Sequence, residues 1–464
     1  MKNKNSFLIF LALLILFSAI SFFRLDTDFG WHLRSGEYIT THGIPHNDIF
    51  TYTAKNFVWI NHEWLNDVII STIYGFGGYA LLAVFFGLLW SGTILLASRS
   101  SSWFLIFLAT LAVLPYAGIR PVIWSLFFFV LLERILEKKN KYRAFILPIF
   151  FLIWANLHGG FVLGLAILGS YILVSKTKIS LPVVIATFFA TLINPYGLNL
   201  YREIGRTLFD TKLHVRILEW LPLFFGSYGI FYIALFSALF LTVYKNKNRL
   251  HRIASLPGAL LILSVASTRY LPFFIVSSLR YLEMWFRKFK RSIPPLLTGT
   301  RRFTWYLLIF LGTSVILYGI IYSLYSLQRD PEASYPKKAV AYLRLHPCKG
   351  NIFNAYDFGG YLIWRLPEQP VYIDGRMPSW KNFGQSYLEN YYKILEDQAF
   401  RKREFKTYKI ACAILYTKQK KNWIINYFFP LSRYDEANLS ETLKKEGWRA
   451  IVEENYSVLL ITDR

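Results

Sequence analysis

Long runs of apolar residues, separated by short polar stretches, dominate the first two thirds of the chain. The first run, Phe7 to Phe23, follows two lysines and lacks the small-residue cleavage site of a signal peptide, so we expect an uncleaved transmembrane helix. Ten further runs predict more spans, several of them short for a bilayer. They cover residues 67–97, 103–118, 121–136, 144–157, 161–175, 180–193, 226–243, 253–266, 270–284 and 304–326. The pattern predicts a polytopic α-helical membrane protein with about 11 transmembrane helices.

Basic residues are distributed unevenly between alternate loops. If the N-terminus is inside, the inner loops hold 21 Lys and Arg residues, and the outer loops before residue 328 hold nine. Because Lys and Arg are retained on the cytoplasmic side, this orientation is favoured. An odd number of spans then places residues 328–464 outside. We expect a multi-pass protein of the cytoplasmic (inner) membrane with its C-terminal domain outside.

The composition fits a protein whose first partner is the lipid bilayer. Hydrophobic residues make up 54% of the chain and charged residues only 17%, against about 25% charged in soluble proteins. This excludes disorder, a coiled coil and an ordinary cytosolic enzyme. The net charge of +24 follows from the topology, so nucleic acid is excluded as a partner.

The first outer loop, residues 24–66, carries the clearest polar signal. It opens on Asp26-Thr27-Asp28, directly after the first span, where carboxylates are unfavourable unless they are paired, metal-bound or functional. Residues 31–39 predict an amphipathic helix on the membrane surface, which Gly43 and Pro45 end. The carboxylates either pair with nearby arginines or supply a catalytic base or a metal site.

Other ionisable residues also fall on the predicted outer face. Arg120 and Arg269 lie at outer turns and suit phosphate binding, with a snorkelling Arg as the alternative. His158 either contacts a lipid phosphate or is a hydrogen-bonded structural residue. We expect Glu219 to be structural. His32, His62 and Glu63 in the first outer loop complete the set of outer-face candidates.

The composition changes near residue 328, and residues 328–464 predict a small α/β domain. The expected helices are 337–345, 384–397 and 437–446, and the expected strands are 351–353, 371–373, 410–415, 448–452 and 457–461. Asp357 and Asp374 follow predicted strand ends, where ligand groups often gather. Asp374 and Arg376 are candidates either for a structural ion pair or for a ligand site. Cys348 and Cys412 either pair or stay as buried thiols.

The first outer loop resembles that of the GT-C superfamily of membrane glycosyltransferases. Protein-mannosyl and aminoarabinose transferases of that class carry an Asp-Glu pair followed about fifteen positions later by Gly, which Asp28 and Gly43 match, although Phe29 replaces the Glu. The Asp26-x-Asp28 spacing is similar to the metal-binding start of oligosaccharyltransferases, which implies Mg or Mn at Asp26 and Asp28. Residues 355–359 loosely resemble the Trp-Trp-Asp-Tyr-Gly signature of those enzymes, but both tryptophans are missing.

The resemblance implies an inverting glycosyltransferase, an enzyme that moves a sugar from a polyprenyl-phosphate donor to a glycan, lipid or protein acceptor outside the cytoplasm. Asp28 is then the expected general base, with Asp26 second. Arg269, Arg120, His158 or a divalent metal would neutralise the leaving phosphate. The alternatives are a glycolipid transporter or flippase, a polysaccharide ligase, and a non-catalytic envelope assembly protein.

Overall fold

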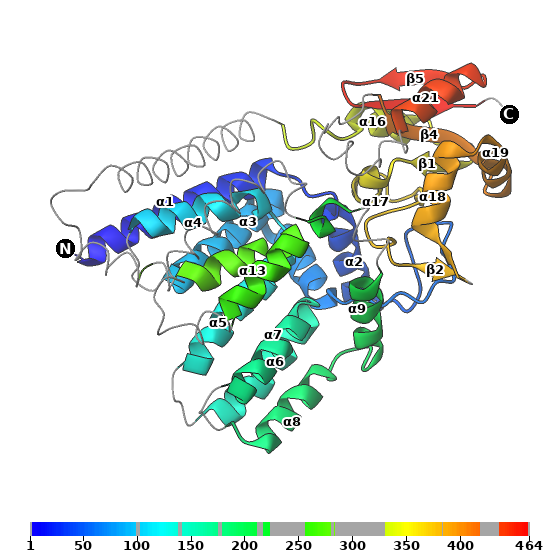
Figure 1. The fold of residues 1–464 in the computed structure, drawn as a ribbon. Coiled ribbons are helices and arrows are strands. Elements are labelled where there is room, and N and C mark those ends of the chain that lie inside the picture. The colour runs from blue at the N-terminus through cyan, green and yellow to red at the C-terminus, as the bar shows by residue number, and fades with distance from the viewer. Residues whose placement is uncertain are drawn as a thin grey trace, which may run out of the picture. The chain divides into compact units, whose positions relative to one another are not determined.

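The structure, a computed structural model, divides into two compact units (Figure 1). Unit 1 comprises Met1–Arg24, Tyr79–Ile193 and His214–Arg329, and unit 2 comprises Leu25–Gly78, Asn194–Leu213 and Asp330–Arg464. The described residues are 2–98, 103–137, 142–174, 179–210, 217–222, 256–279, 283, 330–382, 384–417 and 436–462. Unit 2 therefore joins most of the predicted first outer loop to the predicted tail domain, while the predicted boundary at residue 327 stays a prediction.

Unit 1 is built from helices. They are α1 (Lys2–Phe23), the second part of α3 (Trp64–Ser98), α4 (Trp103–Val113), η1 (Leu114–Tyr116), α5 (Val122–Glu137), α6 (Arg143–Leu157), α7 (Phe161–Val174), α8 (Leu181–Thr191), η2 (Leu218–Trp220), α13 (Leu256–Ala266) and η5 (Thr268–Tyr270). Residues 271–279 are also helical. Each predicted span within the described residues therefore coincides with helix, whereas the predicted spans 226–243 and 304–326 lie outside them.

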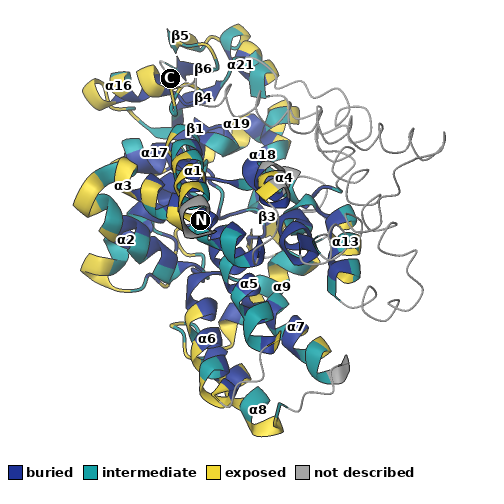
Figure 2. Ribbon diagram, turned by 90° about the vertical axis from the view of Figure 1, so that its left-hand side faces the viewer, coloured by how far each residue is buried: buried dark blue, intermediate teal, exposed yellow. Residues whose placement is uncertain are grey.

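Several of these helices expose an apolar face. On α6, Phe145, Ile149 and Ile153 are exposed at a spacing of four residues, and on α8 Leu181 and Ile185 repeat that spacing (Figure 2). Four residues is about one helical turn, so each set forms one stripe, as lipid contact requires. Two described helices are long and apolar enough to cross a membrane, through Ser6–Phe23 and Trp64–Ser98. The count of about 11 spans stays a prediction.

Helix α3 is not one continuous rod. Gly77 (φ −154°, ψ 20°) and Gly78 (φ 63°, ψ −161°) leave helical geometry, and the conformation of Gly78 favours glycine. The break coincides with a boundary between the units, because residues up to Gly78 belong to unit 2 and residues from Tyr79 to unit 1. The predicted single span 67–97 is therefore two helical segments.

Unit 2 contains a four-stranded sheet with the order β1-β4-β6-β5, in which β1 and β4 are parallel and the other pairs antiparallel. Its strands are β1 (Asn351–Asn354), β4 (Ile410–Tyr416), β5 (Arg449–Glu453) and β6 (Ser457–Ile461), with a separate hairpin of β2 (Lys381–Asn382) and β3 (Gln385–Ser386). The helices are α2 (Phe29–His42), α9 (Asn199–Phe209), α16 (Lys337–Leu345), η6 (Tyr356–Phe358), α17 (Gly359–Arg365), α18 (Tyr387–Glu396), α19 (Gln398–Thr407) and α21 (Glu436–Lys445). A disulfide joins Cys348, ahead of β1, to Cys412 in β4.

The first outer loop pairs with the tail domain. Thr51 forms a parallel bridge with Val371, and the Tyr52 N–H donates to the Val371 carbonyl at 3.3 Å. The Thr53 hydroxyl donates to the Tyr372 carbonyl at 2.7 Å. The predicted strand 371–373 is therefore wrong as a strand of the main sheet, because its backbone partner is the first outer loop.

Helix α2 confirms the predicted helix in the first outer loop, and it ends at Gly43, whose N–H donates to the Ile39 carbonyl. Its apolar side faces protein, however. The Phe29 ring meets Trp364 of α17 edge to face, with centroids 5.0 Å apart, and Leu33 is 1% exposed. The prediction that this helix lies on the membrane through its apolar side is corrected, because α17 covers that side.

Candidate active site

Close backbone packing brings the Asp28 segment onto the tail domain. At four glycines a β-carbon would overlap a neighbouring segment, so the chains can approach this closely only where no side chain is present. The overlaps would be Gly30 with the Gly360 carbonyl, Gly360 with the Thr27 carbonyl, Gly359 with the Ile373 carbonyl and Asp374, and Gly375 with the Asp28 carboxylate. The glycines therefore fix Asp28 between α17 and the turn that carries Asp374.

The Asp28 carboxylate is oriented by two specific contacts. It lies at the N-terminus of α2, and its Oδ1 accepts a hydrogen bond from Trp31 Nε1 at 3.0 Å. Gly375 lies against the same carboxylate, since the atoms that a β-carbon there would meet first all belong to Asp28. Asp26 lies two residues earlier, and its Oδ1 accepts from the Asp28 N–H at 3.0 Å. The carboxylate is thus held in one orientation at the start of a helix.

Two further carboxylates lie near Asp28, and we call Asp28, Asp357 and Asp374 the carboxylate cluster. All three lie close enough to Tyr356 of η6 to affect its pKa. Burial raises the pKa of the Tyr356 hydroxyl most, and the negative charges, chiefly those of Asp28 and Asp357, raise it further. Asp357 Oδ2 accepts from the Tyr416 hydroxyl at 3.3 Å. The cluster thus brings together carboxylates separated by more than 300 residues, beside a phenol that stays protonated.

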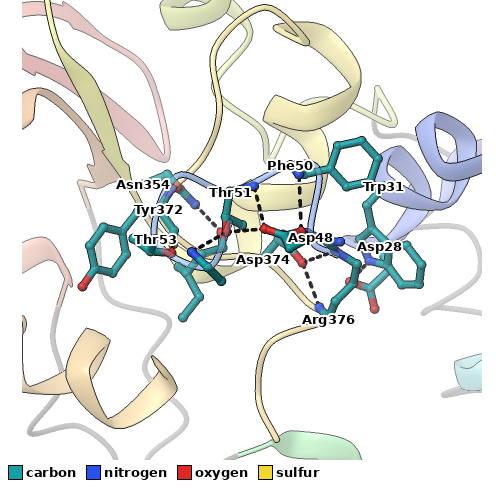
Figure 3. Close-up of polar contacts among 12 residues, drawn as sticks. Asp28, Trp31, Asp48, Phe50, Thr51, Thr53, Asn354, Tyr372, Asp374 and Arg376 are labelled. Atoms are coloured by element: carbon teal, nitrogen blue, oxygen red, sulfur yellow. Dashed lines mark hydrogen bonds and ion pairs between the residues drawn. The ribbon is translucent and has the colours of Figure 1, made fainter. Parts of the chain in front are cut away.

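Arg376 links the carboxylate cluster to the first outer loop (Figure 3). Its Nη2 donates to Asp374 Oδ2 and to Asp48 Oδ1, both at 2.7 Å, and its Nε donates to Asp374 Oδ1 at 2.8 Å. The guanidinium also packs against three aromatic rings, with its carbon 4.4–5.2 Å from the centroids of Phe50, Trp59 and Trp380. We call Asp48, Arg376 and Asp374 the arginine clamp.

The arginine clamp is deeply buried, and its charges depend on one another. The side chains of Asp48 and Asp374 are fully covered and that of Arg376 is 2% exposed. Burial alone would lower the pKa of Arg376, but the charges of Asp374 and Asp48 outweigh it and raise that pKa. A buried ion pair of this kind is strongly unfavourable when one partner is removed, which makes it a device for fixing geometry.

His32 forms a second buried cluster behind Asp28, on the same helix. Its Nδ1 lies 2.6 Å from Asp67 Oδ1 and its Nε2 lies 3.7 Å from Glu63 Oε2. Burial alone would lower the pKa of His32, but Asp67 and then Glu63 and Asp28 raise it to about 9. The imidazole is therefore protonated at neutral pH. His62, also a candidate, lies 3.6 Å from the other oxygen of Glu63.

Unit 1 contains a site of opposite charge. Arg120 pairs with Glu219, and Arg269 packs over Trp220 with its guanidinium carbon 4.9 Å from the ring centroid. Burial alone would raise the pKa of Glu219, but the charges of Arg120, Arg269 and Arg24 outweigh it and lower that pKa. We call these three arginines around Glu219 the guanidinium cluster.

Backbone contacts hold the guanidinium cluster together. The hydroxyls of Ser267 and Thr268 both donate to the Glu219 carbonyl, at 3.1 and 2.9 Å. Arg24 Nη1 donates to the carbonyls of Leu114, Pro115 and Ala117. The three arginines thus come from chain segments far apart in sequence, and only Arg24 among them is shown donating to the carbonyls of a turn.

His158 occupies a buried position elsewhere in unit 1. Its Nδ1 lies 2.6 Å from Ser125 Oγ and accepts from the Gly160 N–H at 3.0 Å, and Ser125 Oγ in turn accepts from Trp154 Nε1. This network matches the structural alternative for His158, and its predicted phosphate role stays a prediction.

Sequence reasoning missed three residues of the site. Asp48 completes the arginine clamp, Gly375 touches Asp28, and Asp67 anchors His32. The available signal was their position, because Asp48 lies in the first outer loop with its two other aspartates and Asp67 is a carboxylate at the edge of an apolar run. Gly375 lies between Asp374 and Arg376, both of which the sequence marks as candidate site residues.

Few described side chains are placed to bind a divalent cation. Among the described residues, no group of three or more His, Cys, Asp or Glu side chains is arranged to hold a metal ion. Asp26 and Asp28 offer two carboxylates two residues apart, and Mg²⁺ is commonly bound by one or two carboxylates plus substrate phosphate and water. The residues present therefore fit an ion shared with a phosphate ligand.

Comparison with known proteins gives one clear likeness. No protein-family model and no curated protein sequence matches the chain. Among solved structures, the archaeal oligosaccharyltransferase AglB from Archaeoglobus fulgidus, in complex with an inhibitory peptide and a dolichol-phosphate, has a TM-score of 0.57 at 13% identity, over 94% of this chain and 72% of that chain. The apo form of the oligosaccharyltransferase from that organism has a TM-score of 0.57 at 13% identity, over 93% of this chain and 72% of that chain. A third structure, of that organism's oligosaccharyltransferase tethered to an acceptor peptide containing the NVT sequon, has a TM-score of 0.52 at 12% identity. It covers 97% of this chain and 74% of that chain.

The likeness covers both units and identifies the fold. The chain shares the overall fold of these oligosaccharyltransferase structures. The fold expected from the first outer loop is thereby confirmed. At 13% identity the likeness is one of fold alone.

Proposed function

We propose that this protein is a membrane glycosyltransferase that moves a sugar from a polyprenyl-phosphate donor to an acceptor outside the cytoplasm. The observation that carries the proposal is the seating of Asp28 at the start of α2, hydrogen-bonded to Trp31 and packed against Gly375 within the carboxylate cluster. A base acts efficiently only when its orientation toward the acceptor proton is fixed. The GT-C fold gives the proposal its reaction class.

In the proposed reaction Asp28 takes the proton of the acceptor hydroxyl. The hydroxyl oxygen then bonds to the anomeric carbon, the bond from that carbon to the phosphate oxygen breaks, and its electron pair leaves with the lipid phosphate. One displacement inverts the anomeric configuration and needs no second carboxylate nucleophile. Asp357, with the neighbouring Tyr356, is a candidate to bind the acceptor, because a carboxylate and a phenol together accept and donate hydrogen bonds.

The guanidinium cluster is the proposed binding site of the donor phosphate. The charges of Arg120, Arg269 and Arg24 all act on Glu219 and lower its pKa, so the cluster gathers positive charge of the kind that attracts a phosphate. Arg is suited to this role because its planar donors match phosphate oxygens. A divalent cation held by Asp26 and Asp28 would supply further charge neutralisation at a phosphate.

The test uses the full-length protein in membranes and a panel of undecaprenyl-phosphate sugars, with transfer to host glycan or lipid as the readout. We expect the wild type to transfer from at least one donor, and Asp28→Asn, expressed to the same level, to lose transfer. The matched control is Asp330→Asn, since Asp330 is a half-exposed carboxylate of the same unit, paired with Lys337. Full activity of Asp28→Asn would contradict the proposal.

The same experiment separates the other classes of function. A transporter or flippase would move the labelled donor across a vesicle membrane without forming a new glycosidic bond. A ligase that depends on outer arginines would keep its activity in Asp28→Asn and lose it in Arg269→Ala. A non-catalytic assembly protein would show no transfer with any donor, while its deletion would still alter the host surface glycan.

A further inference from the structure

One tripeptide, Asp374-Gly375-Arg376, belongs to both the arginine clamp and the wall of the candidate active site. Asp374 and Arg376 are joined by three hydrogen bonds, two from the guanidinium and one from the Arg376 N–H, at 2.7–2.9 Å. The residue between them, Gly375, faces the Asp28 carboxylate. Any movement of the clamp therefore moves the surface against which Asp28 rests.

The arginine clamp is anchored from the opposite side by the first outer loop. Asp48 accepts from Arg376, and its second oxygen accepts from the Thr51 N–H at 2.9 Å and from the Thr51 hydroxyl. Thr51 in turn bridges to Val371, a few residues before the tripeptide. Val371, Thr51, Asp48 and Arg376 are thus connected by successive contacts. These contacts hold both sides of the turn that carries Gly375.

One nitrogen of the clamp guanidinium has no described hydrogen-bond partner. Arg376 Nη1 is buried without a hydrogen-bond partner among the described residues, while Nη2 serves two carboxylates. Arg401, a second buried arginine of unit 2, shares this feature, because its Nε is also buried without a hydrogen-bond partner among the described residues.

We propose that Gly375 and Arg376 are positioning residues for Asp28, and that the arginine clamp sets the orientation of this base toward the acceptor hydroxyl. The proposal rests on the proposed function. Gly375 acts as the contact surface, and Arg376 holds that surface in place through Asp48 and Asp374. Neither residue needs to touch the substrate.

The sharpest test is Gly375→Ala. The atoms that the new methyl group would meet first all belong to the end of the Asp28 side chain, which can rotate away, so the fold should be preserved while the carboxylate loses Trp31. We expect kcat to fall about 10- to 100-fold, with the donor KM within about twofold. The acidic limb of the pH profile of kcat should move to higher pH, because a lost hydrogen bond to the charged form raises the pKa of a base.

The matched control is Gly205→Ala, also in unit 2, where the nearest atom to a new β-carbon is 4.0 Å away on Phe209. It should leave kcat and the pH profile unchanged. Both variants would be assayed in membranes with the undecaprenyl-phosphate sugar on which the wild type is most active. A Gly375→Ala enzyme with wild-type kcat and pH profile would overturn the proposal.

Arg376→Lys tests the clamp itself, because lysine keeps the charge and loses the forked hydrogen bonds. Its matched control is Arg401→Lys, since Arg401 is equally buried in unit 2 and pairs with Glu446, with no contact to the tripeptide among the bonds described for it. Both should lower the melting temperature. Only Arg376→Lys should also shift the pH profile, and equal profiles for the two variants would overturn the role of Arg376.

Failure of this proposal is distinct from failure of the proposed function. If Asp28→Asn is inactive while Gly375→Ala and Arg376→Lys keep the wild-type pH profile, Asp28 stays the base and only the positioning role is wrong. If Asp28→Asn is fully active, the base assignment and the positioning role are both wrong.

Discussion

The carboxylate cluster of unit 2 and the guanidinium cluster of unit 1 are organised by different means. Asp28 is held by close packing, because glycines at positions 359, 360 and 375 let three chain segments approach one another. The arginines are held by charge, because three of them act on Glu219, and Arg24 also donates to carbonyls of a turn. From this difference we expect substitutions that change shape to matter most at the first site and substitutions that change charge to matter most at the second.

The first and largest effect should come from lengthening the base. Asp28→Glu keeps the charge, but the added methylene group has no room beside Gly375, so we expect a loss of transfer of about 100-fold or more, close to that of Asp28→Asn. Steady-state kinetics on both variants would measure it. Near wild-type activity in Asp28→Glu would mean that charge alone matters at this site too.

The second effect concerns the scaffold of the carboxylate cluster. The disulfide between Cys348 and Cys412 closes a loop with a sequence separation of 64 residues, and its removal should lower the free energy of unfolding of unit 2 by about 4 kcal/mol. Cys348→Ser with Cys412→Ser should lower the melting temperature and the transfer rate together. Reduction by dithiothreitol should reproduce the change in wild type and have no effect on the double variant.

The third effect tests whether charge matters more than shape at the guanidinium cluster. Arg269→Ala should raise the donor KM about 10- to 100-fold, since a hydrogen bond to a charged group contributes about 1.5–3 kcal/mol. Arg269→Lys should keep most of the affinity, in contrast to Asp28→Glu. Arg202→Ala is the control, because Arg202 is exposed on α9. Equal losses for the alanine and lysine variants would show that shape governs this site as well.

The smallest effect is a loss of stability of unit 2 at alkaline pH. The pKa of His32 is about 9 in the folded protein, raised by Asp67, Glu63 and Asp28 against the effect of burial, and about 6.5 when unfolded. Because the folded value is the higher one, the stabilisation is complete below about pH 6.5 and is lost as the pH rises through about 9, by the order of 1–3 kcal/mol.

Melting curves between pH 6 and pH 10 would measure this loss for unit 2. In His32→Gln the melting temperature should start lower and fall less steeply with pH. His346→Gln, at an exposed histidine after α16, should follow the wild-type curve. Parallel curves for wild type and His32→Gln would contradict the assignment of His32 as the titrating group.

Local features of the chain were predictable from its sequence. The end of α2 at Gly43 follows from the conformational freedom of glycine, and helix α16 coincides with the predicted range 337–345. Strands β1, β4, β5 and β6 lie within one residue of their predicted limits, since short apolar runs between polar turns favour strands. These signals depend only on neighbours in the sequence.

Long-range partners were not predictable in the same way. Arg120 is 99 residues from Glu219, so the pattern near Arg120 gave no hint of that pair. The membrane placement of α2 failed for a similar reason, because an apolar stripe does not distinguish lipid from the apolar face of α17. Gly375 has no side chain to attract attention, although its lack of one is the reason that Asp28 fits beside it.

Unit 2 is made of segments far apart in the sequence, which determines when it can fold during synthesis. Leu25–Gly78 is made early, but the segment that it packs against begins at Asp330, about 250 residues later. At about 5–20 residues per second, the ribosome needs roughly 10–50 s to deliver that partner. Throughout this interval Trp31 and Phe29 lack their buried environment, so assembly of unit 2 is governed by the timing of translation as well as by thermodynamic stability.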